Sequence, residues 1–187
     1  INERDVRLLK EMVKTKLDLE LSLTQEMVDL AKEIKPHWVC LVPERPEEVT
    51  TEGGLDLFSV ARRAKEVIPQ LKGAGIKITL FVEADEKIIR KASELKADAV
   101  EINTGGYADA RTDEDRFSQL ERIRSGAQLA SELGLEVHAG HGLHYKNVLS
   151  IARIEQVEEL SIGHAIVSRA IFVGLDSAVR EMIELVK

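Results

Sequence analysis

This chain is poor in the residues that mark several protein classes. It has one cysteine, Cys40, and four prolines in 187 residues. A single cysteine excludes an internal disulfide framework and favours a reducing compartment, so we expect a cytoplasmic protein. No apolar run approaches the roughly 18 residues that a membrane span needs, and no signal-peptide pattern opens the sequence. A hydrophobic content of 44% predicts a globular domain rather than a disordered chain.

The chain also lacks an excess of positive charge. Its 26 Lys and Arg residues against 33 Asp and Glu residues give a net charge of −7 and a pI near 5.4. An acidic surface gains little from contact with nucleic acid or an anionic membrane, so neither is an expected partner. Phosphorylated small molecules remain suitable ligands, because backbone dipoles close to a ligand can outweigh a distant net charge.

Strand-like apolar runs alternate with longer amphipathic segments along the sequence. The predicted strands are 17–23, 37–43, 77–83, 99–104, 136–140 and 159–164. The predicted helices are 3–14, 25–34, 57–74, 86–95, 113–133, 146–151 and 175–186. This alternation predicts an α/β fold with parallel strands joined by right-handed crossovers. Both a (β/α) barrel and an open doubly wound sheet satisfy it.

The first predicted strand distinguishes the two architectures. In LDLELSL the leucines share one face, whereas Asp18, Glu20 and Ser22 share the other. An open sheet covered by helices on both faces should be apolar on both, so the barrel is preferred. A complete eight-stranded barrel takes about 250 residues. We therefore expect residues 1–187 to form a single (β/α)8 barrel domain with extra helices, incomplete at its N-terminus, with roughly two βα units preceding Ile1.

Three residues at the predicted strand ends have the chemistry of an active site. His141 lies between Gly140 and Gly142 in the turn AGHGL, where an imidazole can act near neutral pH beside free backbone N–H groups. Glu20 and Glu101 are predicted to face the barrel interior, where desolvation raises a carboxyl pKa and suits it to general acid or base catalysis. A structural ion pair is the alternative for each carboxylate, and a hydrogen-bonded turn is the alternative for the histidine.

Further candidates lie in the loops that follow the strands. Gly163 and His164 end the last predicted strand, where barrels commonly bind phosphate. Thr104 is predicted to contact a substrate oxygen. The segment 43–56 is long for a βα loop, usually ~2–6 residues, and is predicted to be a lid or a solvated loop. A zinc cluster of His138, His141 and His144 is disfavoured, because their spacing does not match helix-based histidine pairs, and no metal is predicted.

Six segments in this order carry a resemblance to a known family: RDVRLL, LDLELSLT, KPHWVCLVPERPEEVTTEGGLD, EINTGGYADA, AGHGLHYKNV and SIGHAIVSRA. They are similar to the segments of the pyridoxine 5'-phosphate synthase family and span the whole chain. The resemblance implies a (β/α)8 barrel that assembles as a homo-octamer, a tetramer of dimers. It also implies condensation of 3-amino-2-oxopropyl phosphate with 1-deoxy-D-xylulose 5-phosphate to pyridoxine 5'-phosphate, phosphate and water, without metal or organic cofactor.

The same resemblance implies a role for individual residues. Glu20 becomes an acid/base residue, His141 a proton donor, and Glu101 a group that stabilises transition states. The implied substrate and phosphate contacts are Thr50, Gly142, Gly163 and His164. A further catalytic histidine and several substrate ligands are implied to precede the first residue.

Two other functions stay open at this point. An aldolase or epimerase on a phosphate-binding barrel would need an inward lysine or metal ligands, and the predicted strands contain no obvious inward lysine. A non-catalytic βα-repeat module would show a fixed repeat period, which the uneven spacing of these units does not show.

Overall fold

The computed structural model describes residues 1–43 and 53–187. Its strands are β1 (Asp18–Leu21), β2 (Trp38–Leu41), β3 (Lys77–Val82), β4 (Ala99–Asn103), β5 (Glu136–Gly140) and β6 (Glu159–Ser161). Its helices are α1 (Glu3–Met12), α2 (Gln25–Ile34), α3 (Ala61–Gly73), α4 (Glu86–Glu94), α5 (Gly105–Ala108), α6 (Asp113–Glu132), α7 (Val148–Ala152), α8 (His164–Val173) and α9 (Leu175–Val186). All neighbouring strands pair in parallel, in the order β1-β2-β3-β4-β5-β6. The predicted α/β alternation is therefore confirmed.

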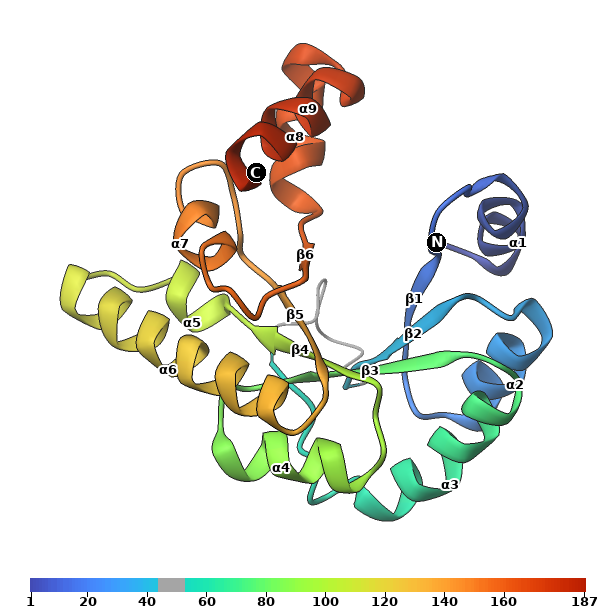
Figure 1. Cartoon of the computed structure of the whole chain (residues 1–187). Helices are drawn as coiled ribbons and strands as arrows, with labels where there is room; N and C mark the ends of the chain where they lie inside the picture. Colours follow the sequence, from blue (N-terminus) through green and yellow to red (C-terminus); the bar gives the residue numbers. More distant parts are fainter. Residues whose placement is uncertain (44–52) are drawn as a thin grey trace.

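The sheet curls like part of a (β/α)8 barrel wall (Figure 1). Helices α2, α3, α4 and α6 lie on its convex side, while β1 and β6 are its two edges. Helix α1 lies beside one edge, and α8 and α9 lie beyond the other. The Lys16 ammonium, just before β1, is 2.6 Å from Glu159 Oε2 on β6. The curvature thus brings the two edges within reach of one ion pair.

Successive side chains of each strand point to opposite faces of the sheet, and the two faces have different environments, as the sequence predicts. On the convex face the strands bury an aliphatic core beneath the helices, which includes Leu21, Val39, Leu41, Ile78, Leu80, Val100, Ile102 and Val137. The concave face carries polar groups, among them Asp18, Glu20, Glu101 and His138. Because helices cover only the convex face, these polar side chains are turned toward the barrel axis.

Local capping explains several boundaries. Helix α4 begins after Asp85, whose carboxylate accepts hydrogen bonds from the N–H groups of Lys87 (2.9 Å) and Ile88 (3.2 Å). Helix α3 begins at Ala61 rather than at 57, because the Asp56 carboxylate accepts from two following N–H groups and forms a turn first.

The structure corrects two expectations about the elements. Helix α8 occupies residues 164–173, so the last predicted strand ends early, at Ser161. The expectation that no strand carries an inward lysine is wrong for Lys77, whose Nζ lies 4.6 Å from the Trp38 ring centroid and 3.8 Å from Glu136 Oε2. Among the described helices, none combines the length and the apolar character that crossing a bilayer requires.

Candidate active site

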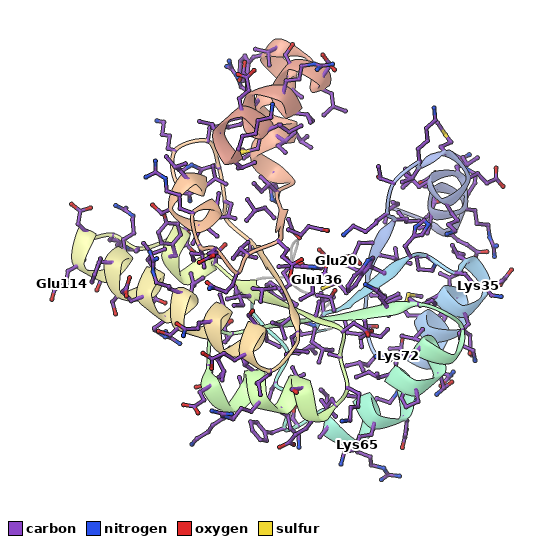
Figure 2. The ribbon with its side chains drawn as sticks, in the orientation of Figure 1. Glu20, Lys35, Lys65, Lys72, Glu114 and Glu136 are labelled. Atoms are coloured by element: carbon purple, nitrogen blue, oxygen red, sulfur yellow. The ribbon has the colours of Figure 1, made fainter. Side chains whose placement is uncertain are left out.

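A cavity of about 1050 Å³ lies on the concave side, where the carboxyl ends of the strands meet. Its lining includes six of the predicted site residues: Glu20, Glu101, His141, Gly142, Gly163 and His164. Figure 2 shows Glu20 inside the curve of the sheet, whereas Glu114 lies on the outer helix α6. The structure thus brings together candidates from β1, β4 and the loops after β5 and β6. The seventh, Thr50, and most of the predicted lid at 43–56 fall outside the described residues.

Glu101 is the most buried carboxylate of the cavity, with 4% of its surface exposed. Its pKa is raised to about 7, mainly by desolvation; a hydrogen bond from the Ser161 side chain acts in the opposite direction, and the nearby negative charges of Glu20 and Asp18 add to the increase. The carboxylate packs directly over Gly140, where a Cβ atom would overlap it. Glycine at 140 is therefore required by the position of Glu101.

Glu20 stands across the cavity on β1. Desolvation raises its pKa, and the positive charge that His141 can carry lowers it. The residue is exposed because the concave side is open, so this desolvation comes from the surrounding cavity wall rather than from complete burial. Glu20 and His141 both line this cavity, so one bound molecule can contact both side chains.

His141 adopts an unusual backbone conformation, with a φ of 81°, and Gly142 follows with a φ of 72°. Left-handed backbone is uncommon for a residue with a side chain and is found mainly where the surrounding structure enforces it. Here the Thr104 N–H donates to the Gly140 carbonyl at 2.8 Å, and the Thr104 hydroxyl lies 2.5 Å from the His141 carbonyl oxygen. On the other side of the turn, the Asn147 amide donates to the Gly142 carbonyl at 3.1 Å.

The His141 ring rests against the backbone that follows β4. A Cβ atom on Gly105 would lie 2.8 Å from His141 Cδ2, so the imidazole uses the space that glycine leaves. The Gly105 N–H donates to Asn103 Oδ1 at 2.9 Å, and Asn103 Nδ2 donates to Glu83 Oε1 at 2.7 Å. Side chains at the ends of β3 and β4 thus fix the surface on which the ring lies.

Three of these residues were missed or misread from the sequence. Thr104 was predicted to contact substrate, but its hydroxyl contacts the backbone of the neighbouring turn instead. Ser161 and Asn147 were not singled out. Ser161 lies opposite Gly140 in the pairing of β5 with β6, beside the His141 turn, and this register across the sheet leaves no signal in the sequence.

The far side of the cavity is formed by the start of α8. Gly163 is the N-terminal cap of this helix, and no side chain in the described part of the protein caps its first N–H groups. His164 and Ala165 line the cavity beside them. No lysine or arginine occurs among the described residues of the lining, so the donors available there to an anion are backbone N–H groups, histidines and the hydroxyls of Ser161 and Ser168.

A second polar cluster lies deeper, at the opposite ends of the strands. The described residues contain one group with the spacing of metal ligands, formed by Asp18, His138 and Glu159, whose ligand atoms all lie within 4.8 Å of one another. The Lys16 ammonium, 2.6 Å from Glu159, already supplies positive charge there. The pKa of Asp18 is raised to about 6, mainly by desolvation, which outweighs the opposing effect of the His138 side chain. His138 lies in this deeper cluster, while His141 and His144 line the cavity.

Comparison with known proteins agrees with this geometry. The profile of a family described as "Pyridoxal phosphate biosynthesis protein PdxJ" matches residues 1–187. Pyridoxine 5'-phosphate synthase of Gloeothece citriformis is 50% identical over 182 residues, which cover 97% of this chain and 76% of that protein. The enzyme of the same name from a Synechococcus strain is 51% identical over the same shares. Among solved structures, the tryptophan synthase α-subunit of Pyrococcus furiosus superposes with a TM-score of 0.62 at 13% identity, covering 98% of this chain and 70% of that one.

Proposed function

This chain belongs to the family of the pyridoxal phosphate biosynthesis protein PdxJ, and we propose that the cavity is the active site of a pyridoxine 5'-phosphate synthase. The observation that supports this most is the convergence of Glu20, Glu101 and His141 from three separate strands on one cavity. The reaction joins 3-amino-2-oxopropyl phosphate to 1-deoxy-D-xylulose 5-phosphate and releases pyridoxine 5'-phosphate, phosphate and water.

The reaction needs repeated proton transfer. The substrate amine attacks the ketone of its partner, and loss of water from the adduct forms a C=N bond. The imine then tautomerises to an enamine, phosphate leaves, and a water molecule supplies the oxygen of the hydroxymethyl group in its place. An aldol-type C–C bond closes the ring, and further loss of water makes it aromatic. Each step moves a proton to or from nitrogen, oxygen or carbon, and groups that titrate near neutral pH perform such transfers efficiently. Because the imine forms between the two substrates, no lysine of the protein has to attack.

We assign the roles from position and charge. Glu20 acts as the general acid/base, and its raised pKa favours proton exchange. His141 donates a proton from the opposite wall. Glu101, with a pKa of about 7, is present in both protonation states at neutral pH and stabilises charge that develops during ring formation. The start of α8, with Gly163, His164 and the Gly142 turn, binds a substrate phosphate through N–H donors. Thr50 is proposed as a further substrate contact on the family motif alone.

The surroundings of the site support further proposals. We propose that the protein is cytoplasmic, where its single buried thiol stays reduced.

We also propose that copies of the chain associate with one another and that the complete assembly is an octamer. Apolar side chains stand exposed along α8 and the start of α9, namely Val167, Ile171, Phe172 and Leu175. The mass in solution, measured by light scattering, tests this, and a monomer at micromolar concentration would contradict it.

Turnover of the two substrates by purified variants tests the assignment. Glu20→Gln and His141→Asn should each lower kcat by at least ~100-fold, the range of a lost acid/base group, with unchanged thermal unfolding. Glu114→Gln makes the same chemical change on the exposed outer helix and should keep full activity. Wild-type activity in either site variant would overturn the assignment.

A further inference from the structure

We infer that Thr104 is a positioning residue, whose hydroxyl holds His141 in its left-handed conformation and thereby sets the direction of the imidazole. This inference rests on the proposed role of His141 as proton donor. It assigns to Thr104 a part in the reaction although its side chain does not line the cavity.

The first step in the argument is the conformation itself. His141 is one of three described residues other than glycine with positive φ, and the other two, Lys35 and Lys96, lie at the ends of helices α2 and α4. Residues at such helix ends are commonly left-handed. His141 has no helix before it, so its conformation requires another source of stabilisation.

The contacts of Thr104 supply that source. Thr104 is completely buried, and it follows β4 while His141 follows the neighbouring strand β5. The Gly140 carbonyl already accepts a hydrogen bond from the Thr104 N–H at 2.8 Å. The hydroxyl has one proton, and its shorter contact, 2.5 Å against 2.8 Å, is to the His141 carbonyl. We therefore assign the His141 carbonyl as the acceptor.

The consequence for the ring follows from the chain geometry. In the left-handed region the Cα–Cβ bond leaves the backbone in a different direction from that of an extended residue. If the turn relaxed to a negative φ, the imidazole would leave its place against Gly105, where only a glycine gives it room. A proton donor displaced by about 1 Å loses roughly two orders of magnitude in rate.

The isosteric substitution Thr104→Val tests the inference, because it removes the hydroxyl and keeps the volume. We expect kcat to fall by ~10- to 100-fold with KM changed by less than about threefold, since the proton donor is misplaced while the binding groups remain. Thr104→Ser retains the hydroxyl and should keep kcat within about threefold of wild type. If the valine variant does not fold, Thr104→Ala gives the same comparison with serine.

A double-mutant cycle separates this role from a purely structural one. Because Thr104 acts through His141, adding Thr104→Val to His141→Asn should lower kcat by no more than about twofold beyond the single His141 variant. Losses that multiply, equal losses in the serine and valine variants, or full activity of the valine variant would each overturn the inference. If His141→Asn itself keeps wild-type activity, the proposed function of the site fails instead, so the two failures are distinguishable.

Discussion

The burial of Glu101 has a measurable effect on the stability of the protein. Its pKa is raised from an ordinary value of 4.5 to about 7, so the folded state binds the proton more tightly than the unfolded state does. A carboxyl with a raised pKa therefore favours folding at low pH, and this contribution is lost as the pH rises from 4.5 through 7. The substitution Glu101→Gln removes the ionisable group and should abolish this part of the pH dependence.

The size of the effect follows from the two pKa values. The interval from 4.5 to about 7, at about 1.4 kcal/mol per pH unit, corresponds to roughly 3 kcal/mol of destabilisation when Glu101 is fully ionised. At pH 8.5, Glu101→Gln should therefore have a higher free energy of unfolding than the wild type. At a pH below 4.5, this advantage of the variant over the wild type should be smaller by roughly 3 kcal/mol. Asp18, whose pKa is also raised, is present in both proteins, so its direct contribution cancels in the difference.

Urea unfolding followed by circular dichroism at several pH values from 4.5 to 8.5 measures this difference. The same variant should lose synthase activity, so stability and activity change in opposite directions. A difference in stability between the two proteins that does not change with pH would refute the burial argument, as would a difference in which the advantage of the Gln variant becomes larger toward low pH.

Three further predictions concern individual contacts. Gly105→Ala places a Cβ 2.8 Å from His141 Cδ2 and should reduce kcat by ~100-fold through displacement of the ring; steady-state kinetics at an unchanged melting temperature would show this, and normal turnover would count against the packing described. His164→Ala should raise KM for a phosphorylated substrate about 10-fold with a smaller effect on kcat, since it removes a hydrogen-bond donor to the anion but no proposed acid/base group. An unaltered KM would argue against phosphate at the start of α8. Asp85→Ala removes the cap of α4 and should cost about 1 kcal/mol in urea unfolding while activity persists; no loss of stability would show that the cap contributes nothing.

The order of the strands and the direction of their side chains could be predicted from the sequence. Alternation in LDLELSL assigned Glu20 to the concave side, and the same reasoning assigned Glu101. Helix α8 was missed because HAIVSRAIFV is apolar on nearly all sides, so no periodic polar face marks it as a helix. Lys77 was misread because its position at the start of β3 gave no sign that its chain would cover Trp38.

Contacts across the sheet could not be predicted from sequence. Thr104 and His141 are 37 positions apart, and they meet because β4 and β5 pair with Asn103 opposite Gly140. A register shifted by one residue would point the threonine to the other face of the sheet. The left-handed φ of His141 likewise follows from this pairing and not from a local preference of histidine.

The central claim is that Glu20, Glu101 and His141 surround one substrate site. A crystal structure of the protein soaked with 3-amino-2-oxopropyl phosphate tests it most directly. We predict electron density for the carbon skeleton between Glu20 and His141, with the phosphate at the N–H groups of residues 163–165. Substrate bound elsewhere on the protein, with this cavity containing only water, would contradict the account.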